Sequence, residues 1–450
     1  MPSDAAKTAT TATDTIAAIA TASGKGAIGI VKISGDRSHE IGSLLTGRRL
    51  KPRLACYTPF CSADNVTIDH GVAIFFKGPD SYTGEDVLEL QSHGNHLLLD
   101  QLLQAATSAG ARPARPGEFT ERAFLNDKMD LAQAEAVSDL IQASTAEAAS
   151  AAVRSLQGEF SARIAVILEQ LLNCRVYIES ALDFAEEEID FLKDTELAER
   201  FAELDSSVSQ LLLRSHEGAL LRDGISIVIA GLPNVGKSSL LNRLTGQDTA
   251  IVTDIAGTTR DVLKEKINID GMPVHIIDTA GLRSSDDPIE QEGVRRAHDQ
   301  IKQADRILFV VVAGQVPDNS LLAELPGDIP VTVVLNKSDL QLENSSGNTG
   351  LLVSAKTGEG FEELRAHLKQ CAGFEKTAEG ALMARRRHID ALLNAQRHIK
   401  SAHRKLVNDG AGELAAEELR QAQDQINLIT GEFTSDDLLG EIFSRFCIGK

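Results

Sequence analysis

The spacing of apolar residues along the chain changes several times and indicates different kinds of structure. In residues 15–120, short runs of apolar and β-branched residues alternate with turns, and a helical stretch lies near 96–106. The strand-like runs lie at 15–20, 27–33, 71–76 and 87–90. Short runs of this kind, separated by turn residues, are typical of the strands in a compact α/β domain.

A helical pattern begins near residue 126. In 126–217 the residues Ala, Leu, Glu and Gln dominate, and apolar positions recur every three or four residues, which predicts long helices. Helical character returns from Met383 to the C-terminus. We therefore predict an N-terminal α/β domain (1–125), a helical domain in two parts (126–217 and 374–450), and an inserted α/β domain (218–373) with a mostly parallel, Rossmann-like sheet. Such insertion is permitted because the two ends of a domain often lie close together.

A phosphate-binding loop is predicted at 231–238, where the sequence reads G-x-x-x-x-G-K-S. An apolar run precedes this loop and a helically spaced run follows, so the order is strand, glycine loop, helix. The two glycines let backbone N–H groups point at phosphate oxygens, Lys237 adds a charge, and the Ser238 hydroxyl can ligate Mg²⁺. The residues expected to hold the nucleotide here are Asn234, Val235, Gly236, Lys237, Ser238 and Ser239.

Three further motifs follow in order. Asp278 ends an apolar run and opens D-x-x-G, where a carboxylate can hold the water shell of Mg²⁺ and Gly281 can sense a γ-phosphate. Asn336 and Asp339 belong to N-K-S-D and suit a guanine edge, because the carboxylate accepts from N–H groups that adenine lacks. An S-A-K loop then backs the base. The predicted contacts are Asp278, Thr279, Ala280, Gly281, Asn336, Lys337, Asp339, Ser354, Ala355 and Lys356.

The segment between the phosphate loop and Asp278 can serve as a switch loop. Thr259 in this segment can reach the metal, so Ser238 and Thr259 are the predicted Mg²⁺ ligands. The other predicted nucleotide contacts of the segment are Thr253, Asp254, Ile255, Ala256, Gly257 and Thr258. All the motifs in order predict a guanine-specific GTPase domain.

Composition narrows the remaining possibilities. The 450 residues give room for about three domains. A formal charge of −20 argues against non-specific coating of nucleic acid, although the basic run 385–388 is a local candidate for phosphate contacts. Five scattered cysteines without a C-x-x-C pair, no membrane-length apolar run and no leader-like features in residues 1–14 lead us to expect a cytoplasmic protein.

Several segments outside these motifs resemble one family. They are S-Y-T-G-E-D at 81–86, P-G-E-F at 116–119, K-M-D-L-A-Q-A-E-A at 128–136, G-E-F-T-S-D-D-L at 431–438 and F-C-I-G-K at 446–450. With the GTPase motifs, they make the chain similar to the MnmE (TrmE) family of tRNA-modification GTPases over nearly its whole length. The resemblance implies an N-terminal folate-binding and dimerisation domain, a discontinuous helical domain, an inserted Ras-like GTPase domain and a homodimer.

The resemblance also implies a reaction. The family acts in a heterotetramer with the flavoprotein MnmG, which carries the FAD. It adds an aminomethyl or carboxymethylaminomethyl group to C5 of the wobble uridine of certain tRNAs. The one-carbon unit comes from a tetrahydrofolate derivative, the 5-formyl or methylene form. The implied folate contacts are Lys32, Glu89, Lys128 and Lys450, whose charges can meet the pterin edge and the glutamate tail.

Hydrolysis needs a positioned water and a cation for transition-state charge. Leu282 stands where many small GTPases carry Gln, so the water must be positioned from elsewhere, and the resemblance selects Glu290 as the catalytic carboxylate. Arg260 and Arg283 are arginine-finger candidates by position. The alternative is a monovalent ion held by the Asn234 side chain. The resemblance implies a K⁺ site made by Asn234, Thr253, Ile255 and Thr258.

Two other functions remain open from the residues. A ribosome-assembly GTPase of the Era or Der type shares this form of P-loop, but its appended region is usually basic, whereas here the appended regions are acidic and helical. A folate-dependent aminomethyl transferase with GTP only as a regulator would transfer its carbon unit without hydrolysis. Cys447 suits either a nucleophile or a small semi-buried thiol.

Overall fold

Two compact units make up the chain, and each is described by itself. The first contains residues 1–138 and 427–450, and the second contains 139–426. The computed structural model describes residues 14–183, 195–247, 264–278, 302, 304–317, 322–323, 326–340, 350–374, 380–432 and 436–449. Within this part of the chain, no helix has the length and apolar character to cross a bilayer.

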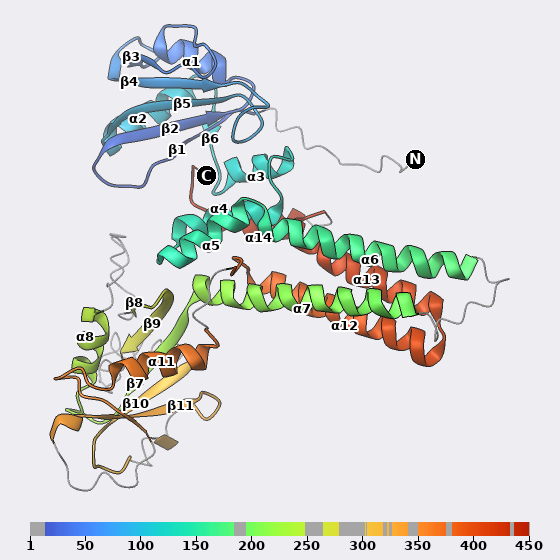
Figure 1. Ribbon diagram of the computed structural model, residues 1–450. Helices are drawn as coiled ribbons and strands as arrows, with labels where there is room; N and C mark the ends of the chain where they lie inside the picture. Colours follow the sequence, from blue (N-terminus) through green and yellow to red (C-terminus); the bar gives the residue numbers. More distant parts are fainter. Residues whose placement is uncertain are drawn as a thin grey trace. The chain divides into compact units, whose positions relative to one another are not determined.

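The first unit is built on a six-stranded sheet in the order β3-β4-β5-β2-β1-β6 (Figure 1). Its strands are β1 (Ile16–Ile19), β2 (Gly26–Ser34), β3 (Cys56–Cys61), β4 (Thr67–Phe76), β5 (Val87–Gly94) and β6 (Arg112–Pro113). Only β1 and β6 pair in parallel. The helices α1 (Ser38–Thr46) and α2 (His96–Ser108) bury their apolar sides against Val31, Ile33, Leu88 and Leu90.

The four strand-like runs of the sequence are confirmed as β1, β2, β4 and β5, and the helical stretch near residue 96 is confirmed as α2. The strands β3 and β6 and the helix α1 were not predicted. Alternation in β2 and β5 buries Val31, Ile33, Leu88 and Leu90 under the helices. The intervening residues Lys32 and Glu89 therefore belong to the other face of the sheet.

A second small core joins the chain's C-terminal residues to the first unit. The helix α4 (Leu131–Gln142) contributes Leu131 and Ala134 to this core, and α14 (Asp436–Ser444) with the residues after it contributes Ile442, Phe443 and Phe446. Phe124 of α3 (Glu118–Leu125) packs against these residues. Beyond α14, the Gly117 N–H donates to the Cys447 carbonyl at 3.3 Å. A Cβ on Gly449 would lie 2.3 Å from the Ile19 carbonyl oxygen. The C-terminal residues thus pack closely on β1.

Long helices form one part of the second unit (Figure 1). They are α5 (Ala146–Leu156), α6 (Glu159–Asp183), α7 (Thr195–Asp223), α12 (Arg386–Asp409) and α13 (Gly412–Thr430). In α7, Leu197, Phe201, Leu204 and Val208 recur every three or four residues and are buried. This one-sided spacing confirms the helical prediction, since an amphipathic helix buries one stripe against its neighbours.

A second six-stranded sheet forms the rest of this unit, in the order β12-β11-β10-β7-β9-β8. Its strands are β7 (Ile225–Ala230), β8 (Lys264–Ile269), β9 (Met272–Asp278), β10 (Arg306–Val312), β11 (Val331–Asn336) and β12 (Leu351–Leu352). All pairs are parallel except β8 with β9. The helices α8 (Lys237–Gln247) and α11 (Phe361–Ala372) pack their apolar sides into its core. The predicted mostly parallel sheet is confirmed.

Candidate functional site

The predicted phosphate loop joins the end of β7 to the start of α8. Gly231 and Gly236 have φ of +145° and +98°. A Cβ on Gly231 would lie 2.3 Å from the Val310 carbonyl oxygen, and a Cβ on Gly236 would lie 2.3 Å from Asn336 Nδ2. Only glycine fits these two positions, so the loop backbone can curl tightly before the helix begins.

Lys237 is the first residue of α8. Its Nζ donates to the carbonyl oxygens of Gly231 at 2.8 Å and Leu232 at 3.0 Å. The ammonium group therefore lies over the loop, beside the N–H groups at the start of the helix. A helix N-terminus with an adjacent cation is suited to phosphate. The Ser238 hydroxyl, on the next residue, is exposed and available to a metal ion.

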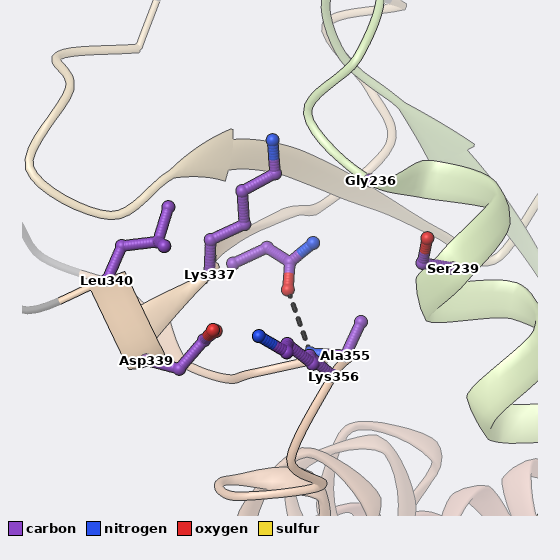
Figure 2. Close-up of a pocket in the computed structure, with 8 residues that line it drawn as sticks. Gly236, Ser239, Lys337, Asp339, Leu340, Ala355 and Lys356 are labelled. Carbon is purple, nitrogen blue, oxygen red and sulfur yellow. Dashed lines mark hydrogen bonds between the residues drawn. The ribbon is translucent and has the colours of Figure 1, made fainter.

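A cavity of about 400 Å³ adjoins this loop at the ends of β11 and β12 (Figure 2). It is lined by Gly236, Ser239, Asn336, Lys337, Asp339, Leu340, Ala355 and Lys356. Seven of these eight residues were predicted nucleotide contacts, so the structure brings the phosphate loop and the two base motifs to one cavity. Leu340 was not predicted; its only signal in the sequence is its position directly after Asp339.

Hydrogen bonds hold the three loops together. Asn336 Nδ2 donates to the Val235 carbonyl at 2.9 Å, and Asn336 Oδ1 accepts from the Ala355 N–H at 3.1 Å, the dashed line in Figure 2. Lys337 Nζ donates to the Asn234 carbonyl at 2.8 Å. Asn336 is buried, so its amide acts as a fixed bridge between the phosphate loop and the base loop.

Asp339 is the residue suited to select the base. The Ser354 hydroxyl donates to Asp339 Oδ1 at 2.7 Å. This hydrogen bond is the main reason that the pKa of Asp339 lies below its usual value. The carboxylate is therefore ionised at neutral pH and can accept from both N–H groups of a guanine edge, which adenine cannot offer.

Part of the predicted GTPase site lies outside the described residues. These predictions are Thr253, Asp254, Ile255, Ala256, Gly257, Thr258, Thr259, Thr279, Ala280, Gly281 and Glu290. Asp278 is described through its backbone alone. It pairs with Ile229 at the end of β9, so its backbone lies beside the strand that leads into the phosphate loop.

Three of the four predicted folate contacts lie in the described part of the first unit. Lys32 and Glu89 face each other across β2 and β5, and both are half-buried. Lys32 Nζ lies 5.1 Å from the centre of the Tyr82 ring. Lys128 Nζ donates to the Pro79 carbonyl at 2.9 Å. The loop between β4 and β5 therefore contacts both lysines. Lys450 lies outside the described residues.

An ion-pair network fixes the far end of this same loop. Arg122 is 3% exposed. Its guanidinium contacts Glu85 at 3.0 Å, Asp14 at 2.8 Å and Glu118 at 3.2 Å. Ser34 Oγ also donates to Glu85 at 2.7 Å. The loop residue Glu85 is thus held by β2 and α3 together.

A phosphate loop at the end of a parallel strand, joined to a carboxylate that can read guanine, defines a P-loop GTP-binding protein. Comparison with known proteins narrows this class. The family model described as "MnmE helical domain" matches residues 131–447, and the family model described as "GTP-binding protein TrmE N-terminus" matches residues 15–128. The chain belongs to the MnmE family.

Individual relatives match nearly end to end. The "tRNA modification GTPase MnmE" of Pseudomonas aeruginosa (strain UCBPP-PA14) is 54% identical to this chain. The match covers 98% of this chain and 99% of the Pseudomonas protein. The protein of the same name from Vibrio vulnificus (strain YJ016) is 53% identical, and the match covers 97% of this chain and 100% of the Vibrio protein. Among solved structures, the G domain of the T. maritima FeoB iron transporter is 28% identical over 33% of this chain and 98% of its own, with a TM-score of 0.24.

Proposed function

We propose that the protein is a K⁺-stimulated GTPase that works in tRNA modification. The observation that carries the GTPase part is the single cavity in which Gly236 of the phosphate loop, Asp339 and Ala355 meet. The observation that carries the tRNA part is family membership, since the curated relatives are named tRNA modification GTPases. A ribosome-assembly function of the Era or Der type is not favoured, because the match to MnmE covers nearly the whole chain.

In this proposal the phosphates lie on the loop before α8, with Lys237 as the counter-charge. Ser238 supplies a hydroxyl to Mg²⁺, together with Thr259. The ion neutralises phosphate charge when it is bound. Glu290 positions the attacking water through its charge, since the Leu282 side chain has no polar group.

K⁺ takes the place of an arginine finger in this proposal. Its ligands are Asn234, Thr253, Ile255 and Thr258. Asn234 has φ of +62°, a conformation that Asn tolerates better than most residues. Asn234 is exposed, and its backbone carbonyl accepts a hydrogen bond from Lys337. An exposed amide oxygen on the phosphate loop is suited to a cation.

The K⁺ site is tested by GTP hydrolysis in K⁺ and in Na⁺ at equal ionic strength. Asn234→Gly is the better variant, because glycine adopts the same backbone without the side-chain oxygen. Asn234→Ala also strains the loop and serves as the comparison. We expect K⁺ stimulation in the wild type and its loss in Asn234→Gly with GDP binding kept. Equal rates in both salts for the wild type would remove the K⁺ site and return Arg260 and Arg283 to consideration.

The modification itself is proposed for a cytoplasmic homodimer assembled with MnmG into a heterotetramer. MnmG supplies FAD, and the first unit of this chain supplies a 5-formyl- or methylene-tetrahydrofolate. The opposed charges of Lys32 and Glu89 fit that ligand, because a carboxylate can pair with the amidine-like pterin edge and a lysine with a carboxylate of the tail. Lys128 and Lys450 complete the proposed set.

One reconstitution tests whether hydrolysis drives modification. The protein, MnmG, tRNA, GTP and a folate donor are combined, and modified wobble uridine is measured with released phosphate. Glu290→Ala is expected to bind GTP and to lose both activities, whereas Glu292→Ala, two residues further along the sequence, keeps both. A Glu290→Ala protein that modifies tRNA normally without hydrolysing GTP would support the transferase with GTP as a mere regulator.

A further inference from the structure

Arg243 lies on α8 and contacts the base loop, although it belongs to none of the recognised motifs. Its Nη1 donates to the Lys356 carbonyl at 3.2 Å, and its Nη2 donates to the Thr357 carbonyl at 2.9 Å. The two donors of one planar group thus bind two consecutive carbonyl oxygens. A guanidinium presents these two donors in one rigid plane, whereas an ammonium is a single charged centre on a flexible stem and does not fix the two carbonyls in that geometry.

Gly358 makes room for this contact. Its φ is +92°, and a Cβ there would lie 2.1 Å from Arg243 Nη2. A side chain at this position would meet the guanidinium and would strain the turn. The close approach of Arg243 therefore depends on glycine directly after the two bonded carbonyls.

The turn that Arg243 holds is the one that orients the base-reading groups. Ser354 organises it: the Thr357 N–H donates to Ser354 Oγ at 3.1 Å, and the Gly358 N–H donates to the Ser354 carbonyl at 2.8 Å. The same Ser354 hydroxyl donates to Asp339. Movement of residues 356–358 would therefore be passed through Ser354 to the carboxylate that faces guanine.

We propose that Arg243 is a positioning residue for guanine selectivity. It fixes the 354–358 turn to α8, so that Asp339 and the Ala355 N–H are held at a set distance from the phosphate loop. The helix that carries Arg243 begins at Lys237, so one rigid element joins the phosphate and base subsites. This inference rests on the proposed GTP site.

The test is equilibrium binding of GDP, IDP and ADP to the full-length protein. IDP lacks the exocyclic amine that Asp339 is expected to accept from. Arg243→Met keeps the length of the side chain and removes its donors, Arg243→Lys keeps the charge, and Asn242→Ala is an exposed neighbour on α8 used as the matched control. Hydrogen exchange of amides 354–358 without nucleotide gives a second readout.

We expect Arg243→Met to raise the Kd for GDP about tenfold and the Kd for IDP less, so that the GDP/IDP preference narrows. Tenfold corresponds to about 1.4 kcal/mol, which two hydrogen bonds to carbonyls can supply. Amides 354–358 should exchange faster in this variant. Arg243→Lys should recover part of the preference, and Asn242→Ala should match the wild type.

Each other outcome has a distinct meaning. An unchanged GDP/IDP ratio with unchanged exchange in a folded Arg243→Met protein would overturn the inference. Equal losses for GDP, IDP and ADP would also overturn it, because they would indicate a general structural role. If the wild-type protein binds GDP no better than ADP, the proposed GTP site itself is wrong.

Discussion

Replacement of Gly218 by alanine should destabilise the second unit. Gly218 lies on α7 where the segment 381–384 crosses the helix. This segment leads into α12, and its four residues are each at most 3% exposed. Its backbone is held by the Arg214 carbonyl, which accepts from the Leu382 N–H at 3.3 Å, and by Arg154, which donates to the Ala381 carbonyl at 2.7 Å.

The size of the effect follows from the distance. A Cβ on Gly218 would lie 1.7 Å from the Leu382 carbonyl oxygen, whereas real Cβ atoms keep at least 3.0 Å. The obstacle is backbone, so the segment must move. Overpacking costs about 1–3 kcal/mol, and loss of the Leu382 hydrogen bond costs about 1 kcal/mol. Alanine regains about 1 kcal/mol of helix propensity, which leaves a net destabilisation of about 1–3 kcal/mol.

Gly246→Ala is the matched control. Gly246 is also helical, on α8, and a Cβ there would meet no atom of the described residues within 4 Å. It should stabilise the helix by up to about 1 kcal/mol. Because a chain of two units need not unfold in one step, the assay is hydrogen exchange of α7 and α12 amides together with the melting temperature. A Gly218→Ala protein that matches Gly246→Ala in both readouts would refute the close contact.

Three further predictions concern the two sites. Arg122→Met should destabilise the first unit by about 1–3 kcal/mol, because Glu85 loses its hydrogen-bonded cation and the buried Glu118 keeps only its contacts with Arg112 and Arg115. Denaturant unfolding of that unit measures the loss, and an unfolding midpoint like that of the wild type would contradict it. Burial alone would raise the pKa of Glu118, but hydrogen bonds led by that from Arg112 hold it below 4.5. The ionised form therefore stabilises the fold above about pH 4.5, and this stabilisation disappears as the pH falls through the lowered pKa. Arg112→Gln should flatten the acid limb of a stability–pH curve. Asp339→Asn should make the protein prefer XTP to GTP, because xanthine has an oxygen acceptor at C2 where guanine has an amine donor. Competition binding of the two nucleotides measures this preference, and a variant that still prefers GTP would count against the role of the carboxylate.

The four strands that the sequence predicted contain short runs rich in apolar residues, and none of these runs contains proline. The strand β3 was missed because it contains Pro59, which cannot donate to a neighbouring strand and normally ends a strand prediction. Proline is tolerated here because β3 lies at the edge of its sheet. The strand β6 has only two residues, one of them Pro113, and is too short to leave a pattern.

The candidate GTP site was predictable where chemistry is fixed by a contiguous motif. Gly231 and Gly236 could be assigned to the phosphate loop because its tight backbone path requires glycine. Asn336 and Asp339 could be assigned to the base because their spacing in N-K-S-D suits guanine. The contacts between motifs were not predictable. Lys337 reaches the Asn234 carbonyl across 103 residues, and Arg243 reaches the Lys356 carbonyl across 113. Such pairs depend on how strands are ordered in the sheet, which no local spacing records.

The apolar core of the nucleotide-binding sheet extends into the helices. Ala151 of α5 and Leu221 of α7 are buried in the same cluster as Met272 and Val274 of β9. The strand β9 ends at Asp278, the first residue of the D-x-x-G motif. Since close-packed interiors transmit strain rather than absorb it, a displacement of β9 must change the packing of α5 and α7. Events at the phosphate loop therefore have a direct physical route to the helices of the same unit.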